Sequence, residues 1–158
     1  MATWAEFELA DPELAQFGHE RLDGQVCFHA TLRSDGWPRV HPVEPWLAAG
    51  LLLVRFRARS PKVGEVMRDG RYALHSPMDN LDGIGGEFLV RGWMERIADA
   101  HPAAQRFATD ASYPLAFYAM SVEEAMGTTY AEDEPVYRRW RPGDQATRPG
   151  EPSGAENS

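Results

Sequence analysis

The chain has 158 residues, which is the length of one ordinary domain and too short for two full ones. Hydrophobic residues make up 43% and charged residues 25%, a balance typical of soluble globular proteins. The formal charge of −8, from 24 acidic against 16 basic residues, argues against nucleic acid or an anionic membrane as the main partner.

The first 24 residues predict an N-terminal helical segment. Asp11 is a preferred capping residue, Pro12 suits the first helical position, and Glu13 lies at the positive end of the helix dipole. The pair Asp23-Gly24 ends the segment. We therefore divide the chain into a helical segment over 1–24, a main domain over 25–143 and a disordered tail over 144–158.

The main domain begins with three predicted strands. Residues 26–33 alternate between apolar and other side chains, as in a half-buried strand, and 34–36 form a turn signal. The returning strand over 38–46 holds three prolines, which lack a backbone donor, so it must lie at a sheet edge or contain bulges. A third strand follows over 51–57.

The rest of the domain predicts two short helices, further strands and one loop. A helix should begin at Ser60, because Ser is a preferred cap and Pro61 suits the first turn. The other predicted elements are a strand over 71–75, a loop over 77–86, a strand over 87–97, a helix over 102–110, and strands over 116–122 and 137–140 separated by an acidic irregular region. Strands this frequent favour a mainly β (α+β) fold and a small barrel.

The densest basic segment, 55–62, runs from a predicted strand into the start of a helix. It contains Lys62, the only lysine among the 16 basic residues. Helix starts present free N–H groups and a positive dipole end, so Ser60 and Lys62 are candidates for binding an anion such as a phosphate. The simpler interpretation is an exposed strand whose arginines face water.

Four motifs in order resemble one known family. They are the hairpin from Thr31 to Val43, the Ser60-Pro61-Lys62 helix start, the Asp69-to-Leu74 strand entry and the Trp140-Arg141-Pro142-Gly143 ending. Together they resemble the flavin-binding split barrels related to pyridoxamine 5′-phosphate oxidase. The resemblance covers residues 25–143.

This resemblance implies a six-stranded antiparallel split β-barrel with a few short helices. It also implies a homodimer that binds FMN, or alternatively a deazaflavin, in the cleft between subunits. The cofactor would contact β-strand residues, a helix start, a residue from the opposite subunit and an aromatic ring flanking the flavin. The strand residues are Arg39, Val40, His41, Pro42 and Val43. At the helix start, Ser60 and Lys62 would hold the phosphate with Phe56 or Arg57 nearby. Glu87 would reach the flavin from the opposite subunit, and Trp140 would flank the ring.

The sequence departs from the family pattern at two of these positions. Pro61 stands where the oxidases commonly have an arginine, and Glu87 stands where a neutral amide is usual. The substrate-binding C-terminus of true pyridoxamine phosphate oxidases is absent, so vitamin B6 oxidation is not assigned. We expect a flavin-dependent oxidoreductase of small molecules whose catalytic residues are unassigned. The alternative is a non-catalytic dimer that binds flavin or haem or has lost its cofactor.

The remaining candidates predict little further chemistry. His29 and His41 are possible haem ligands, but a hydrogen-bonded structural role is the simpler interpretation, and the sequence carries no metal motif. The single cysteine, Cys27, permits no internal disulfide and is expected to be an inert thiol. No signal peptide is visible, and the longest apolar stretch, 46–54, is too short to span a bilayer. These features predict a soluble cytoplasmic protein.

Overall fold

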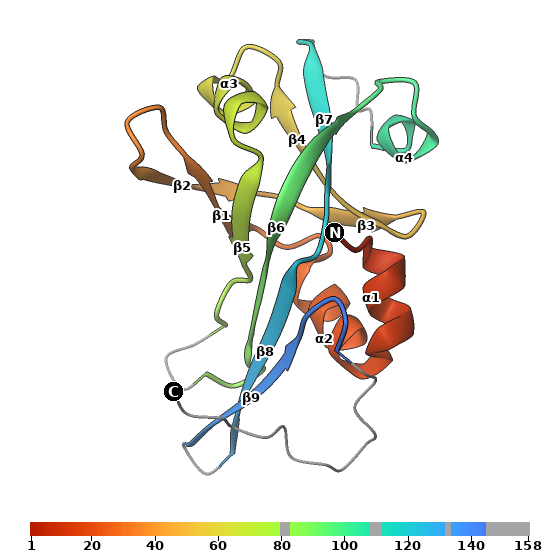
Figure 1. The fold of residues 1–158 in the computed structure, drawn as a ribbon, viewed down its shortest axis with the longest axis vertical. Helices are drawn as coiled ribbons and strands as arrows, with labels where there is room; N and C mark the ends of the chain where they lie inside the picture. Colours follow the sequence, from red (N-terminus) through yellow and green to blue (C-terminus); the bar gives the residue numbers. More distant parts are fainter. Residues whose placement is uncertain (80–82, 108–111, 132–133, 145–158) are drawn as a thin grey trace.

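The computed structural model describes residues 1–79, 83–107, 112–131 and 134–144 (Figure 1). The helices are α1 (Trp4–Ala10), α2 (Pro12–Leu22), α3 (Pro61–Arg68) and α4 (Pro102–Gln105). The strands are β1 (Cys27–Leu32), β2 (Pro38–Val43), β3 (Trp46–Ala48), β4 (Leu51–Arg57), β5 (Arg71–His75), β6 (Glu87–Ile97), β7 (Leu115–Met120), β8 (Glu124–Ala131) and β9 (Glu134–Trp140). Within these ranges, none of the helices combines the length and apolar character needed to cross a membrane.

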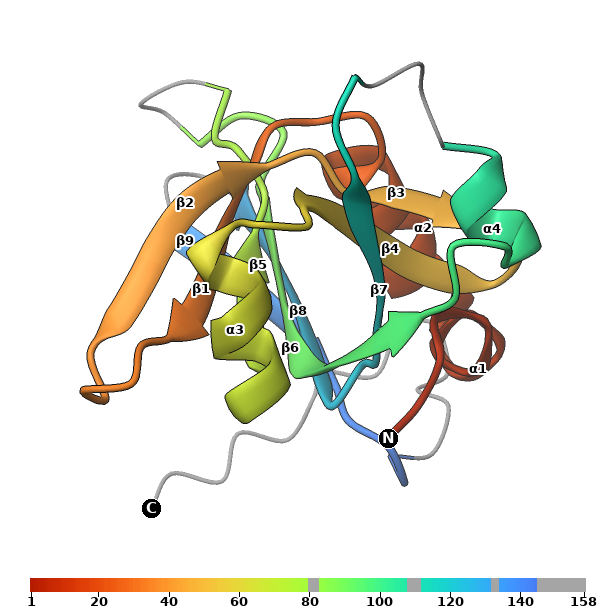
Figure 2. The same ribbon diagram turned by 90° about the horizontal axis from the view of Figure 1, so that it is seen from above.

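The nine described strands form one antiparallel sheet that curls on itself. The order along the sheet is β2-β1-β5-β6-β7-β4-β3, and the β8–β9 hairpin joins through β6. Strands β2 and β3 lie at opposite ends of this order, yet only residues 44–45 separate them in the chain. Because two residues span less than about 10 Å, the two ends of the sheet must approach each other. Figure 2 shows β2 leading directly into β3 across one end of the curled sheet.

The proline-containing strand lies where the sequence predicts it. Strand β2 pairs only with β1 among the described strands, and its neighbour along the chain, β3, begins after a break at Pro45. The prediction over 38–46 is thus confirmed in both forms, since the segment is a sheet edge and is also interrupted. The missing backbone donors of Pro38 and Pro42 cost no ladder hydrogen bond on the free side of β2.

The N-terminal helices pack into the same hydrophobic core as the curled sheet. Helix α1 was not predicted as a separate element, although Thr3 and Glu6 form a complete capping box at its start. Phe7 of α1 and Leu14 of α2 are buried in one cluster with Phe88 of β6. The helical segment over 1–24 therefore closes one side of the barrel (Figure 1).

The C-terminal part differs from the prediction at two points. The region predicted to be irregular contains β8, in which Ala125, Gly127 and Thr128 are buried while Thr129, Tyr130 and Ala131 are exposed. The acidic residues at 132–134 favoured an irregular segment in the sequence. Helix α4 ends at Gln105, and the last predicted residues of that helix, 108–110, lie outside the described ranges, as does the tail from 145.

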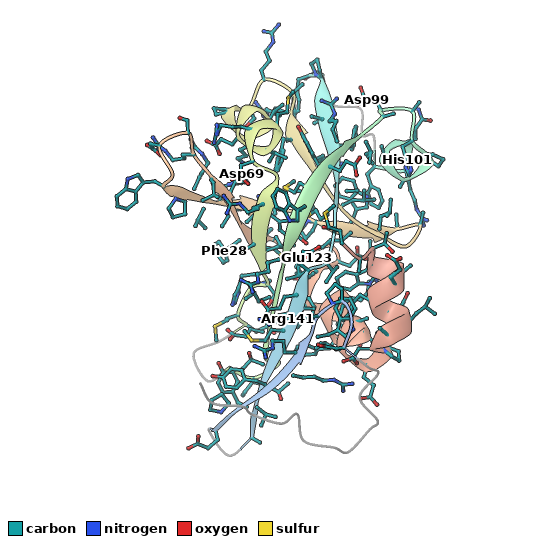
Figure 3. All side chains as sticks on the ribbon, in the orientation of Figure 1. Phe28, Asp69, Asp99, His101, Glu123 and Arg141 are labelled. Carbon is teal, nitrogen blue, oxygen red and sulfur yellow. The ribbon has the colours of Figure 1, made fainter. Side chains whose placement is uncertain are left out.

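Strand β1 is half-buried, and its buried side is the more polar one. Cys27, His29 and Thr31 face the core, whereas Phe28 is 52% exposed on the outer face (Figure 3). Val40, across from Ala30 on β2, is 64% exposed on the same outer face. The curled sheet therefore carries polar residues inside one end and an apolar surface outside it.

Candidate functional site

The turn between β4 and α3 forms one end of an open pocket. Ser60 caps α3, accepting a hydrogen bond from the Lys62 backbone N–H on its hydroxyl (3.4 Å), and its carbonyl accepts one from Val63 (3.0 Å). These bonds occupy two of the first-turn amides that the sequence left free for an anion. Side chains are therefore the main donors available at this turn.

The pocket has a volume of about 230 Å³ and brings together strands β2 and β4 with the start of α3. It collects six of the eleven residues predicted to contact a cofactor, together with Arg55. The lining residues are Pro42, Val43, Arg55, Phe56, Arg57, Ser60 and Lys62. We call it the basic pocket.

Two arginines of the basic pocket are held in place by neighbouring groups. Arg55 donates to the carbonyl of Phe107 (2.6 Å) and lies 3.8 Å from a carboxylate oxygen of Glu44. The guanidinium of Arg57 lies 4.3 Å from the ring centroid of Tyr113. Stacking on a ring orients a guanidinium without neutralising it, so the pocket stays positive.

Lys62 is the least restrained cation of the basic pocket. Its ammonium lies 5.5 Å from the ring centroid of Phe56, and it forms no ion pair with any described residue. Burial lowers the pKa of Lys62, the positive charge of Arg39 lowers it further, and Glu65 opposes both. A bound anion would compensate the buried charge and raise this pKa again.

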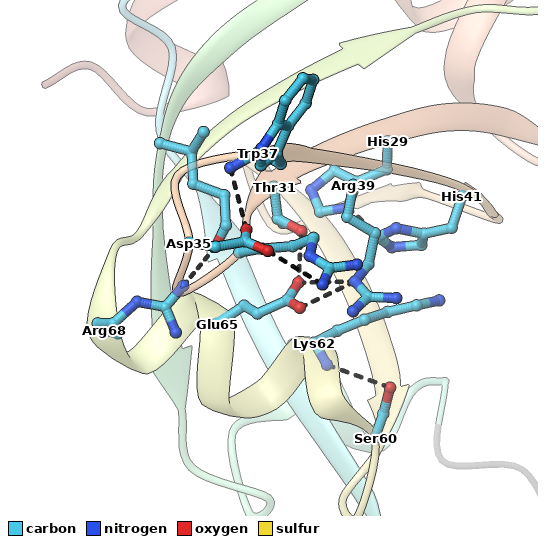
Figure 4. A network of polar contacts seen from close by, with 12 residues as sticks. His29, Thr31, Asp35, Trp37, Arg39, His41, Ser60, Lys62, Glu65 and Arg68 are labelled. Carbon is cyan, nitrogen blue, oxygen red and sulfur yellow. Dashed lines mark hydrogen bonds and ion pairs between the residues drawn. The ribbon is translucent and has the colours of Figure 1, made fainter.

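A buried carboxylate that the sequence analysis missed lies beside this lysine. Glu65 of α3 accepts hydrogen bonds from Thr31 (3.0 Å) and from the Nε of Arg39 (2.8 Å), as Figure 4 shows. The side chain of Glu65 is only 8% exposed. Its position three residues after Lys62 on a short helix was the available signal, because that spacing places both on one face. Glu65 therefore fixes Arg39 on β2 beside the pocket.

The two predicted histidines form a hydrogen-bonded pair inside the barrel. His29 and His41 stand directly opposite each other on β1 and β2, with 3.1 Å between His29 Nδ1 and His41 Nε2. Burial, together with the charges of His41 and Lys62, lowers the pKa of His29 to about 3. Burial, together with Lys62 and Arg39, lowers the pKa of His41 to about 4. Both imidazoles are therefore neutral at pH 7.

The remaining ring nitrogens, His29 Nε2 and His41 Nδ1, are buried and have no hydrogen-bond partner among the described residues. Among the described residues, no cluster of histidine, cysteine and carboxylate side chains has the arrangement of a metal site. Burial also raises the pKa of Cys27 to about 12, which makes its thiol a poor nucleophile.

The other residues predicted to contact the cofactor do not line the basic pocket. Arg39 and His41 flank it on β2 without lining it, and Val40 faces outward on the same strand. Glu87 begins β6 and lies 3.5 Å from His75. Trp140 is buried against Phe7, with 4.9 Å between the ring centroids. A single chain therefore does not bring Glu87 or Trp140 to the basic pocket.

Comparison with known proteins gives similarity at the level of the fold. The sequence matches no protein-family model and no curated protein. Among solved structures, PhzG from Burkholderia lata 383, in complex with tetrahydrophenazine-1-carboxylic acid, superimposes with a TM-score of 0.59 at 14% identity, covering 85% of each chain. A Listeria innocua protein described as a candidate pyridoxamine 5′-phosphate oxidase gives 0.57 at 12% identity, covering 73% of this chain and 95% of its own.

The chain has the pyridoxamine 5′-phosphate oxidase-like split-barrel fold. A haem-binding protein from Mycobacterium smegmatis shares this split barrel, with a TM-score of 0.61 at 15% identity, covering 81% of this chain and 57% of its own. The predicted mainly β class with a few short helices is confirmed. The described residues form nine strands rather than the expected six, because β3 separates from β2 and the β8–β9 hairpin extends the sheet.

Proposed function

We propose that this split barrel binds FMN, or alternatively a deazaflavin, and acts as an oxidoreductase on a small molecule. The observation that carries the proposal is the basic pocket, which joins Arg55, Arg57 and Lys62 to the Ser60 hydroxyl in a protein of net charge −8. A local positive site of this size suits one small phosphorylated ligand rather than a polyanion.

The residues of the basic pocket fit the phosphate end of such a cofactor. The Ser60 hydroxyl accepts from the Lys62 amide, so its own proton is free to be donated to a phosphate oxygen. Lys62 supplies a mobile charge, and Arg57 supplies a planar set of donors. Pro42 and Phe56 give the pocket an apolar wall beside these donors.

A bound flavin supplies hydride transfer, and the protein's contribution is to position the ring and exclude water. The absence of an assigned acid–base pair therefore does not oppose the proposal. The neutral His29–His41 pair and the Glu65–Arg39 ion pair stiffen β2, the strand along which the ring is expected to lie. PhzG and the Listeria protein support the proposal through their shared fold.

The proposal includes a second copy of the chain. The basic pocket, at about 230 Å³, is smaller than the 300–1,000 Å³ typical of sites that enclose a complete small ligand. The outer face beside it is apolar, with Val26, Phe28 and Val40 each more than half exposed. Such a patch on the surface of a small protein marks an interaction site. A homodimer through this face would cover the rest of the cofactor.

The absorbance spectrum of freshly purified protein, followed by titration with FMN and then with a deazaflavin, tests the proposal. We expect either a yellow protein that releases FMN on denaturation or saturable binding of one of the two cofactors. Colourless protein that binds neither would overturn it. A Soret band on haem titration without flavin binding would replace it with the haem alternative. The haem-binding protein from Mycobacterium smegmatis, which shares this fold, motivates that alternative.

Sedimentation velocity tests the dimer separately. Val40→Glu places a charge in the centre of the outer apolar face without touching the basic pocket, so we expect a monomer that binds FMN more weakly. A wild-type protein that sediments as a monomer while binding FMN at full strength would contradict the second-copy proposal alone.

A further inference from the structure

A second, larger pocket of about 610 Å³ lies between the N-terminal residues and strands β6 and β7. Most of its lining side chains are apolar, and none of them lines the basic pocket. The lining residues are Met1, Ala2, Thr3, Leu51, Trp93, Met94, Glu95, Ala119, Met120 and Ser121. We call it the N-terminal pocket.

The N-terminal pocket exists because α4 is too short to cover its face of the sheet. Helix α4 has four residues and packs over Leu53 and Phe117, which are fully or almost fully buried in a separate small cluster. The same sheet face continues past this cluster to Leu51 and Ala119, which are only partly buried. The apolar surface left open there forms the floor of the pocket.

Two side chains give the N-terminal pocket a specific chemistry. Trp93 and Glu95 lie two residues apart on β6 and therefore on the same face of the strand. The indole of Trp93 is 44% exposed. The carboxylate of Glu95 forms no hydrogen bond or ion pair with any other described residue, and it lines the pocket. An aromatic face beside an unpaired carboxylate is the arrangement that attracts an organic cation.

The other charges near this pocket are already paired. The ammonium of Met1 lies 3.4 Å from Glu123. Arg91, which lines a separate hollow on the other side of Trp93, is paired with Glu124. Glu95 therefore remains as the charge that a ligand of the N-terminal pocket would meet.

We propose that the N-terminal pocket binds a small apolar organic cation, with its apolar body on the floor and its charge between Trp93 and Glu95. The volume lies within the range of pockets that enclose small ligands. The site is independent of the flavin proposal. Strand β4 contributes Leu51 to this pocket and Arg57 to the basic pocket, and the six steps along the strand between them span roughly 20 Å.

Isothermal titration calorimetry of the full chain with three probes of similar size tests this site. The probes are 2-phenylethylammonium, 2-phenylethanol and 3-phenylpropanoate, which are positive, neutral and negative at pH 7. A cation–π contact plus a solvent-exposed ion pair favour the cation over the alcohol by about fivefold to tenfold. The carboxylate probe should bind weakest of the three.

The variants assign the effect to its residues. Glu95→Gln should bring the cation and the alcohol within twofold of each other, and Trp93→Leu should weaken both. Glu8→Gln, which removes the same charge from an exposed position on α1, should leave the preference unchanged. Thermal melts confirm that each variant is folded.

Several results would overturn the site. They are equal binding of the three probes, no binding of any probe, tightest binding of 3-phenylpropanoate, or a cation preference that survives Glu95→Gln. Self-association that blocks all three probes would assign the pocket to an interface between copies instead. Lys62→Ala should retain cation binding, so failure of the flavin proposal and failure of this one remain distinguishable.

Discussion

Replacing Lys62 by alanine tests the basic pocket most directly. The ammonium of Lys62 has no ion-pair partner among the described residues, so its removal leaves no other charge stranded. A charged hydrogen bond to a phosphate contributes about 1.5–3 kcal/mol, and the openness of the pocket to solvent favours the lower end. About 1.5 kcal/mol corresponds to roughly a tenfold weaker Kd for FMN.

Titration of FMN, followed by its fluorescence or absorbance, measures this change. Arg59→Ala is the matched control, because Arg59 lies one residue before the cap of α3, is exposed and does not line the basic pocket. We expect it to weaken FMN by less than threefold, through the long-range field alone, and this part should vanish at high salt.

The pH profile adds a second readout. Burial places the pKa of Lys62 below its ordinary value of 10.5, so the free protein loses this charge as the pH rises through that lowered pKa. Wild-type affinity for FMN should therefore fall at alkaline pH, whereas Lys62→Ala should lack this fall. Equal weakening by Lys62→Ala and Arg59→Ala, or no weakening by either, would refute the assignment of the phosphate to this pocket.

Three further predictions concern stability and use urea denaturation. Gly92→Ala should destabilise the fold by about 1–3 kcal/mol, because the added Cβ would collide with the backbone carbonyl of Ser121. Gly64→Ala has open space around it on α3 and should stabilise the fold by up to about 1 kcal/mol. Glu65→Gln should cost about 1.5–3 kcal/mol, because it removes the charge that pairs with a partly buried guanidinium. As the pH falls from about 6.5 to 5, the free energy of unfolding should decrease by up to about 1.4 kcal/mol per pH unit for each of His29 and His41. The cause is that the unfolded state binds protons that the folded pair does not. A double glutamine variant should flatten this slope.

Contrary outcomes of these stability measurements are equally specific. If Gly92→Ala and Gly64→Ala shift the urea midpoint in the same direction, the close approach at Gly92 is not real. An unchanged midpoint in Glu65→Gln would mean that Arg39 is satisfied by solvent. A flat pH profile in the wild type would mean that the histidine pair accepts a proton without unfolding.

Short-range signals in the sequence predicted much of the split barrel. The cap at Ser60, Pro61 at the first helical position and the Asp69-Gly70 stop defined α3 closely. The prolines of β2 predicted a free edge, since a residue without an N–H cannot serve a central strand. The β8 strand was missed because its burial does not alternate, with the neighbours Gly127 and Thr128 both buried.

The candidate site was predictable only in part for the same reason. Ser60 and Lys62 were predicted as site residues because they lie at the start of a helix, and the pocket does contain both. Glu65 was missed because a carboxylate on a short helix is usually solvated. Its burial depends on Thr31 and Arg39, which come from two strands about 30 residues earlier.

The sequence by itself determined the mainly β class, the edge strand and the basic run that ends at the single lysine. Those features depend on backbone donors, side-chain periodicity and charge, which act between residues close in the chain. Only the tertiary structure decided which face of β1 is buried, that His29 faces His41, and that Trp93 and Glu95 border an open pocket. Each of these depends on strand register and on which surfaces the short helices cover, and both are set by contacts between distant parts of the chain.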